Sequence, residues 1–474
     1  MSSNNAAANK GQLSADETQA IIDMDRDHHL HPCQIFDVFP EKGALPIAKG
    51  EGSLIWDTNG NQYLDAVGGL WCNNIGLGRD EMADVIAEQV RELSYANPFV
   101  DMTNVPAAKL AKKLAELAPG HLNHVFFTCG GSTAVDSAYR TVQMYNNCRG
   151  KKDKKHFISR KDAYHGTTYA SMSLGGKEGD HPDYFDFISD SIHHLSSPNH
   201  YRYSNGLSEQ DFADQLVTEF EAKIEELGGA DKVAAFIAEP IMGAGGVVLP
   251  PANYLKRIWE ICKANDILYI SDEVVTGFGR LGEWFASESV FGIVPDIITC
   301  AKGLSSGYLP IGAMIFSEAI FDAISQPGQG YYYSHGYTYS GHPVSCVAAL
   351  KNIEILEREK ILEHVRDVGP YFLEQLNTLR DLDMVGDVRG SHLMVCVELV
   401  KNKETRETFP EELDIGKEVS MVADSMGLIV RPIVNLNVMS PPLVLTKEEA
   451  DTIVSTLRKA ILTAGETMKE RGHW

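Results

Sequence analysis

A lysine directly follows an apolar run in the second half of the chain. The run Ile297-Ile-Thr-Cys-Ala301 predicts a buried strand, and Lys302 comes next. Burial lowers the pKa of an amine because water no longer stabilises its charged form, and a neutral amine is a nucleophile toward carbonyl compounds. The alternative is a lysine whose charged end reaches solvent past the end of the strand.

An acid ends another predicted strand thirty residues earlier, where the run Ile267-Leu-Tyr-Ile-Ser closes on Asp272. Adjacent strands lie about 5 Å apart, so neighbouring strands would bring Asp272 and Lys302 into one cleft. The pair suits a cofactor with an aldehyde on one side of a pyridine ring and the ring nitrogen nearly opposite. Lysine would form an imine, and aspartate would keep the nitrogen protonated. At about 4 Å and an effective dielectric near 20, this pairing is worth about 4 kcal/mol, which keeps the ring an electron sink. Otherwise Asp272 is an ordinary acid at a strand end.

A glycine turn offers a place for a phosphate group. Thr128-Cys-Gly130-Gly131-Ser132-Thr133 stands between the apolar run 125–127 and the helical pattern 134–142. Backbone amides at a helix N-terminus bind phosphate, and glycine permits close approach. A tight strand-to-helix turn is the alternative. Tyr164, in Tyr164-His165-Gly166, offers an aromatic plane for the ring, although an aromatic side chain in a loop more often serves packing.

Two further motifs suggest chemistry that we do not expect. Gly277-Phe-Gly279-Arg-Leu-Gly282 matches a dinucleotide-binding pattern, but residues 273–276 separate it from the strand and no helical apolar pattern begins within it. Asp27-His28-His29-Leu30-His31 resembles a set of metal ligands but lacks a second ligand pair. We therefore predict neither a nicotinamide cofactor nor a metal.

The composition is that of a soluble globular enzyme rather than a disordered or fibrous protein. The 474 residues are 44% hydrophobic and 23% charged. A formal charge of −23 repels nucleic acid and anionic membrane surfaces, so neither is an expected partner. The eight cysteines contain no CxxC pair and are expected to be mostly buried free thiols. We see no secretion signal or membrane span, which predicts a cytoplasmic protein.

Alternating helices and strands must position these residues. Apolar residues from Phe212 to Leu227 recur every three or four positions and predict a helix, which is followed by the strand 233–238. A second helical pattern from Leu255 to Cys262 precedes the strand 267–272. Such a βαβ unit implies parallel strands, with ligands at their carboxyl ends.

The two ends of the chain have a different pattern. Residues 1–15 predict a frayed tail, and residues 50–71 predict a small antiparallel hairpin. After residue 343, long helical patterns and short strands predict a smaller α+β domain. We therefore expect an N-terminal segment (1–80) that joins the small domain, a large α/β domain with a mostly parallel sheet (81–342), and a C-terminal small domain (343–474).

Taken together, these segments resemble the class III aminotransferases, which use pyridoxal 5′-phosphate, and in particular their ω-amine:pyruvate branch. The resemblance runs from Asp27 to about Leu445 and implies fold type I, a large and a small domain, and a homodimer or tetramer. The motifs that carry it are Gly69-Leu-Trp71-Cys72, Tyr164-His-Gly166, Ala238-Glu-Pro240, Asp272-Glu-Val-Val-Thr-Gly-Phe-Gly-Arg280, Ala301-Lys-Gly303 and Tyr337-Thr-Tyr-Ser-Gly-His-Pro343.

The resemblance also implies roles for individual residues. Lys302 would be the catalytic lysine bonded to the cofactor, and Asp272 would bind its ring nitrogen. The other cofactor-binding positions would be Gly131 and Ser132 at the phosphate, Thr338 at the phosphate of the other subunit, Tyr164 and Val274 on the ring faces, and Glu239 nearby. The substrate pocket would be lined by Trp71, Phe99, Tyr164 and Ala244, with Arg431 binding the keto acid's carboxylate. A surface ion pair is the alternative for Arg431.

Two positions depart from the family's pattern. The phosphate loop commonly reads Asn-Ser-Gly-Ser-Glu-Ala, whereas Thr133 stands here in place of the acid; Met242 stands where glutamine is common. Both departures concern substrate preference more than the reaction.

The expected activity is transfer of an amino group from an ω-amine or other primary amine to pyruvate or a similar keto acid, with ping-pong kinetics. An aminomutase, a decarboxylating transaminase and a non-catalytic relative of the fold are the alternatives. The natural donor stays open among diamines, taurine, β-alanine and aryl-alkyl amines.

Overall fold

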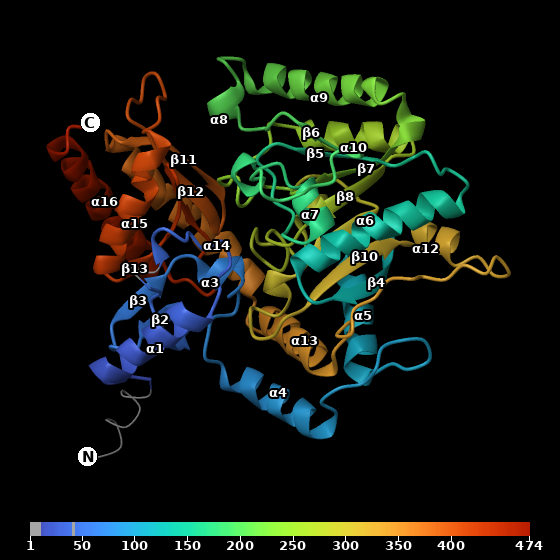
Figure 1. The fold of residues 1–474 in the computed structure, drawn as a ribbon, viewed down its shortest axis with the longest axis horizontal. Coiled ribbons are helices and arrows are strands. Elements are labelled where there is room, and N and C mark those ends of the chain that lie inside the picture. The colour runs from blue at the N-terminus through green and yellow to red at the C-terminus, as the bar shows by residue number, and fades with distance from the viewer. Residues whose placement is uncertain (1–10, 40–42) are drawn as a thin grey trace.

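The computed structural model describes residues 11–39 and 43–474 (Figure 1). Residues 1–10, most of the predicted tail, lie outside the described residues. The rest of that tail is tied down rather than frayed, because the Leu13 amide donates to the Thr58 carbonyl at 2.8 Å and helix α1 (Ala15–His28) begins at Ala15. Ser14 caps the helix: its hydroxyl accepts a hydrogen bond from the Glu17 amide at 3.3 Å, and the Glu17 carboxylate accepts one from the Ser14 amide at 2.9 Å.

A seven-stranded sheet forms the centre of the molecule, in the order β4-β10-β9-β8-β7-β5-β6. Its strands are β4 (Leu122–Thr128), β5 (His156–Arg160), β6 (Ile192–Leu195), β7 (Val233–Ala238), β8 (Leu268–Asp272), β9 (Ile297–Cys300) and β10 (Gly312–Ser317). Only β10 runs antiparallel to its neighbours. The predicted α/β class with a mostly parallel sheet is confirmed.

Helices cover both faces of this sheet (Figure 1). On one face, Val135 and Val142 of α6 (Gly131–Cys148) pack in one apolar cluster with Ile237 of β7. On the other face, α9 (Glu209–Glu226) and α10 (Tyr254–Ala264) pack in a cluster that includes Phe236. Neighbouring residues of β7 therefore face opposite layers, as expected for a strand buried on both sides.

The predicted βαβ unit consists of β7, α10 and β8. Its two strands pair in parallel, and β8 pairs in parallel with β9, with Asp272 opposite Thr299. The strands that end near Asp272 and Lys302 are therefore direct neighbours, and their carboxyl ends share one edge of the sheet.

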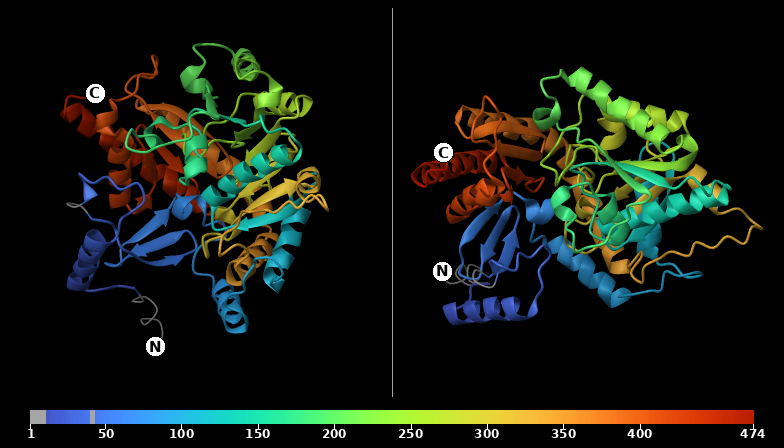
Figure 2. Two further views of the ribbon diagram at one scale, coloured as in Figure 1. Left: turned by 45° about the vertical axis from the view of Figure 1, so that its right-hand side comes forward. Right: turned by 45° about the horizontal axis from the view of Figure 1, so that its top comes forward.

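The N-terminal strands form a small sheet with a strand from near the other end of the chain. The expected antiparallel hairpin is confirmed in β2 (Leu54–Asp57) and β3 (Gln62–Asp65), and β1 (Ile47–Glu51) extends it by a third antiparallel strand. Strand β13 (Leu428–Ile429) pairs in parallel with β3. Figure 2 shows this sheet beside the C-terminal part of the chain in both views.

A third sheet has the order β11-β12-β15-β14. Its strands are β11 (Val385–Ser391), β12 (Met394–Leu399), β14 (Arg431–Ile433) and β15 (Leu436–Met439), accompanied by helices α14 (Ile361–Asn377), α15 (Ile415–Ser425) and α16 (Lys447–Glu470). Helix α13 (Pro343–Arg358) packs instead against α4 (Asp80–Glu92) and α5 (Val105–Leu117), beside the central sheet (Figure 1). The remaining α-helices are α3 (Gly68–Trp71), α7 (Tyr169–Leu174), α8 (His200–Tyr203), α11 (Ala286–Ser289) and α12 (Glu318–Ile324). Short 3₁₀ helices are η1 (Glu178–Asp180), η2 (Ala230–Lys232), η3 (Lys302–Leu304), η4 (Thr378–Asp381) and η5 (Glu411–Leu413).

Two further properties of the described residues bear on the sequence predictions. None of their helices combines the length and apolarity that crossing a membrane requires. All eight cysteines are free, but only four of them are buried, fewer than the sequence suggested.

The glycine pattern at 277–282 forms a tight turn that no helix continues. Gly279 and Gly282 have φ values of 95° and 76°, which favour glycine. The fully buried guanidinium of Arg280 donates to the Asn74 side chain at 2.9 Å and to the carbonyls of Leu393 and Pro441 at 3.0 and 2.5 Å. Burial lowers the pKa of Arg280 to about 10. This arginine joins segments from three parts of the chain.

Replacement of Arg280 by alanine should lower the midpoint of thermal unfolding by about 3 °C or more, because Asn74, Leu393 and Pro441 would keep buried acceptors without a donor. Arg26→Ala is the matched control, since Arg26 forms only exposed ion pairs and should change the midpoint little. Equal midpoints for the two variants would contradict this role of Arg280.

Candidate active site

Lys302 stands at the start of η3, two residues after β9 ends. Its φ of 34° is unusual for a residue with a side chain, and such backbone strain is typical of functional sites. Gly303 is required next to it, since a Cβ there would lie 2.3 Å from Asn74 Nδ2. Within residues 11–39 and 43–474, no hydrogen bond or ion pair engages the Lys302 amine.

The electrostatic surroundings favour the neutral form of this amine. Burial lowers the pKa of Lys302 below its ordinary value. The carboxylates of Asp272 and Glu239 oppose this shift, and the positive charge of Arg431 adds to it. These three residues therefore lie close enough to act on Lys302 through their charges.

Asp272 is the last residue of β8, and only 4% of its surface is exposed. One carboxylate oxygen accepts a hydrogen bond from the Val274 amide at 3.1 Å, and the other lies 2.7 Å from Nδ1 of the buried His165. The ring's Nε2 is buried without a partner among the described residues. Sequence reasoning missed this role of His165, although the residue follows Tyr164 directly.

Glu239, directly after β7, positions two loops. Its carboxylate accepts hydrogen bonds from the amides of Tyr164 at 3.1 Å and Gly243 at 2.8 Å. Burial raises the pKa of Glu239, and the charge of Asp272 raises it further. Tyr164 and the turn that contains Ala244 are thereby fixed to the end of β7.

The glycine turn opens α6, whose first amides have no partner within the helix. The Thr133 hydroxyl accepts from the Gly130 amide at 3.1 Å and lies 2.9 Å from the Gly130 carbonyl, which it donates to. Thr133, one of the two residues that depart from the family's pattern, therefore stabilises the glycine turn through these two hydrogen bonds. The Ser132 hydroxyl accepts from the Thr167 amide at 3.1 Å.

Val274 and Gly131 are in close contact, because a Cβ on Gly131 would lie 2.9 Å from Val274 Cγ1. This contact links the glycine turn to the segment after Asp272. The predicted positions 131, 132, 164, 239, 272 and 274 thus belong to one connected group of loops at the carboxyl edge of the sheet.

The residues predicted to line the substrate pocket differ in their exposure. Trp71 is buried and packs in a cluster with Ile241 and Val247, while Ala244 is half-buried. Met242, the second departure, is fully buried and packs in a cluster with Ala163 and Val248. The buried Met242 side chain therefore supports the Ala244 turn from within the protein interior.

Arg431 begins β14 and is half-buried. Its charge opposes the rise in the pKa of Tyr164, which burial causes, and it also acts on Lys302. No carboxylate of the described residues forms an ion pair with Arg431, so the alternative of a surface ion pair is not observed. A guanidinium without an internal partner is free to bind an added carboxylate.

Phe99 and Thr338 form a separate, exposed group. Phe99 lines a cavity of about 660 Å³ with residues 332–337, and this cavity contains no other predicted site residue. The Tyr95 hydroxyl donates to the Thr338 carbonyl at 3.0 Å, which joins the two segments.

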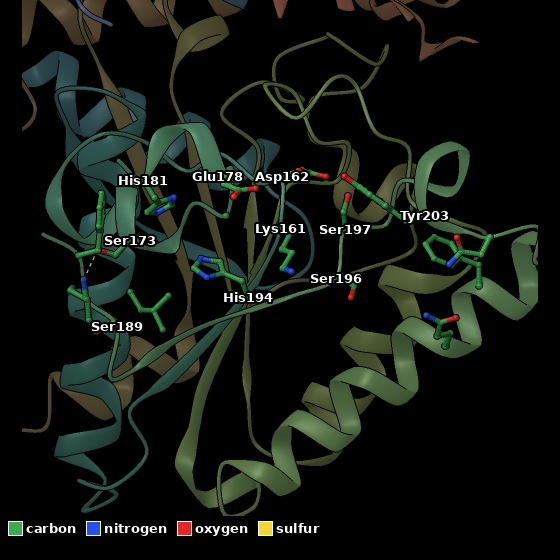
Figure 3. A pocket seen from close by; sticks show the side chains of 17 residues that line it. Lys161, Asp162, Ser173, Glu178, His181, Ser189, His194, Ser196, Ser197 and Tyr203 are labelled. Carbon is green, nitrogen blue, oxygen red and sulfur yellow. Dashed lines mark hydrogen bonds between the residues drawn. The ribbon is translucent and has the colours of Figure 1, made fainter. Parts of the chain in front are cut away.

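A larger cavity, of about 860 Å³, borders the site without containing any predicted residue (Figure 3). Its lining includes Lys161, Glu178, His181 and His194, which Figure 3 shows around one space. Asp162, also in the lining, lies against the Ala244 turn, since a Cβ on Gly245 would lie 2.4 Å from the Asp162 carbonyl oxygen.

Comparison with known proteins gives consistent matches over almost the whole chain. The family model described as aminotransferase class-III matches residues 39–461. The putrescine–pyruvate aminotransferase of Pseudomonas aeruginosa is 42% identical over 95% of this chain and 97% of that protein. A chloroplastic gamma aminobutyrate transaminase of Solanum lycopersicum is 39% identical over 90% of this chain and 82% of that protein.

A solved structure extends the likeness to three dimensions. An (S)-enantioselective omega-transaminase from Thermomicrobium roseum has a TM-score of 0.91 and 37% identity, and the match covers 96% of this chain and 99% of that one. The predicted fold type and enzyme class are both confirmed. The chain belongs to the class III aminotransferases.

Proposed function

We propose that this aminotransferase uses pyridoxal 5′-phosphate to move an amino group from an ω-amine or other primary amine to pyruvate or a similar keto acid. The observation that carries the proposal is the state of the Lys302 amine. Burial lowers its pKa and so favours the neutral form, and the amine has no hydrogen-bond or ion-pair partner among the described residues. Lys302 lies two residues after β9, and β9 pairs with the strand that ends in Asp272. The names of the relatives, one of which pairs putrescine with pyruvate, support the same reaction class.

The residues present fit this cofactor. Asp272 is a buried carboxylate suited to a protonated ring nitrogen, and His165 and the Val274 amide hold it in place. The amides at the start of α6 and the hydroxyl of Ser132 are suited to a phosphate group. When bound, pyridoxal phosphate supplies a positively charged ring that withdraws electrons from the carbon bearing the substrate's nitrogen.

Lys302 is the proposed base. With the cofactor and an amine donor bound, its neutral Nζ would accept the proton from the carbon that bears the donor's amino group and would later return a proton during transfer. Burial of the site among Asp272, Glu239 and Trp71 excludes bulk water from this exchange. The same lysine would serve both half-reactions. The first product leaves before the keto acid binds, and this order gives ping-pong kinetics.

Arg431 is the proposed site for the keto acid's carboxylate. Its guanidinium is half-buried, without an internal ion pair in the described residues, and close enough to act on both Tyr164 and Lys302. A fork of N–H donors matches a carboxylate in geometry and charge. Tyr164, held by Glu239, and Ala244 would border the substrate on the same side.

We further propose a homodimer in which Phe99 and Thr338 serve the active site of the other subunit. The support is their separation from the Lys302 group and the exposed apolar surface around them, which includes Tyr95, Val100 and Tyr332. The same proposal includes pairing of dimers into tetramers and a cytoplasmic location. It also divides the chain into the segments 1–80, 81–342 and 343–474.

A donor panel with pyruvate as acceptor tests the function. The panel contains putrescine, γ-aminobutyrate, taurine, β-alanine and an aryl-alkyl amine, and the readouts are alanine formed and carbon dioxide released. Alanine equal to the donor consumed, without carbon dioxide, supports the proposal. Carbon dioxide release would indicate a decarboxylating transaminase, and isomerisation without alanine an aminomutase.

Replacement of Lys302 by alanine should lower amino transfer to pyruvate by at least about 1,000-fold while cofactor still binds, because the base is lost but the phosphate and ring contacts stay. Alanine production and cofactor content are the measurements. Lys161→Ala, an exposed lysine in the lining of the large cavity, is the control and should keep near-normal turnover. Near-normal turnover of the Lys302 variant would refute the assigned role.

Gly166→Ala should weaken cofactor binding by about tenfold, since overpacking of a tight site costs about 1–3 kcal/mol. Gly166 has φ of 133°, and an added Cβ would lie 2.5 Å from Ser132 Oγ and 2.7 Å from Ser132 Cα. Gly179→Ala is the control, because no atom lies within 4 Å of a Cβ there and the residue lies outside the glycine turn. The Kd of pyridoxal phosphate for the apoenzyme is the measurement, and an equal effect of both substitutions would contradict the prediction.

Arg431→Ala should raise the KM for pyruvate by about 10- to 100-fold, because a hydrogen bond to a charged group is lost. The half-reaction with an amine donor that carries no second charged group should stay nearly unchanged. Separate stopped-flow measurement of the two half-reactions checks this split. A comparable loss in both half-reactions would show that Arg431 acts on the fold or the cofactor rather than on the carboxylate.

A further inference from the structure

A carboxylate and two imidazoles converge where α1 ends. Asp25 lies in the last turn of the helix, His29 is its C-cap, and His31 follows two residues later. Asp25 Oδ1 lies 2.9 Å from His29 Nδ1, and Asp25 Oδ2 lies 2.8 Å from His31 Nε2. One ligand atom from each residue lies within 4.8 Å of the others, and no second group of three such residues occurs among the described residues.

This ligand set suits a borderline divalent cation. Zn²⁺ binds histidine nitrogen and carboxylate oxygen at about 2.0–2.2 Å, and three protein ligands with water in the remaining position form a common arrangement. Two ligands of one ion can therefore lie up to about 4 Å apart, so small side-chain rotations suffice here. His29 is exposed, which leaves one side of the group open to water.

The local charge favours a cation. The C-terminus of a helix carries a partial negative charge, and α1 contains five acids, Asp16, Glu17, Asp23, Asp25 and Asp27, against the single Arg26. Arg26 pairs with Asp23 and Asp27, so Asp25 has only the two histidines as partners in the described residues. A divalent ion would neutralise this surplus.

Neighbouring contacts hold His31 in place. Its backbone amide donates to the Gln34 side chain at 2.9 Å, and its ring lies 4.8 Å from the ring of Phe39. Such outer contacts orient metal ligands and strengthen binding. The sequence motif 27–31 did not reveal this group, because it includes Asp27 and His28 but not Asp25. In the structure the i, i+4 spacing of the helix turns Asp25 toward His29.

We propose that Asp25, His29 and His31 bind one Zn²⁺ ion per chain. The ion closes a short loop between the end of α1 and the segment 29–39. That segment also contains the exposed thiol of Cys33, which is not one of the proposed ligands. The role is structural and does not depend on the proposed amino transfer.

The test uses holoenzyme that has been treated with a chelator and then titrated with Zn²⁺ in a calorimeter, and with Co²⁺ by visible absorbance. Wild-type enzyme should bind one ion per chain. His29→Ala, His31→Ala and the near-isosteric Asp25→Asn should each weaken binding by about tenfold or more. His28→Ala and Asp27→Asn are the matched controls from the same turn and should bind as wild type.

Thermal unfolding provides an independent readout, since an ion that binds only the folded chain raises the unfolding midpoint. Zn²⁺ should raise the midpoint of wild-type enzyme and of His28→Ala but not of His31→Ala. Absence of binding to wild type, undiminished binding to the three ligand variants, or loss of binding in Cys33→Ser would overturn the proposal. None of these measurements depends on transaminase activity. A failure of the zinc proposal can therefore be distinguished from a failure of the proposed amino transfer.

Discussion

The burial of one carboxylate constrains the architecture around the site. Removing a charged group from water is costly unless donors replace the lost solvent, and Asp272 at the end of β8 is almost completely buried. His165 and the Val274 amide provide the donors. The loop after β5 and the segment after β8 must therefore meet at one place, and this meeting also fixes the glycine turn against Val274.

The parallel sheet makes this convergence possible. Strands β5, β7, β8 and β9 all end at the same edge, and each contributes a following segment to the group: His165 after β5, Glu239 after β7, Asp272 in β8 and Lys302 after β9. Fixed strand spacing then brings residues far apart in sequence within electrostatic reach of one another. The helices on both faces exclude water from the strands, so charges at this edge interact through a medium of low polarity.

Residues that end apolar strands could be predicted from the sequence. Lys302 and Asp272 were identified because each closes an apolar run, and the βαβ pattern between 233 and 272 implied the order of two strands. The hydrogen bonds of His165 and Glu239 could not be predicted, because they join loops whose relative positions depend on the whole sheet. The same holds for Arg280, which resembled part of a nucleotide-binding motif but binds carbonyls from two distant segments. The Asp25 group was missed because the end of α1 decides which acid faces the histidines.

The pairing of β3 with β13 has a consequence for folding of the chain during its synthesis on the ribosome. Leu64 and Leu428 lie side by side although they are 364 positions apart in the sequence. The first three strands leave the ribosome early, yet one edge of their sheet stays without its partner until nearly the entire polypeptide has been synthesised. A nascent chain must keep that edge from pairing wrongly for the whole interval, so holdase chaperones and the pace of translation should govern the yield of active enzyme in the cell.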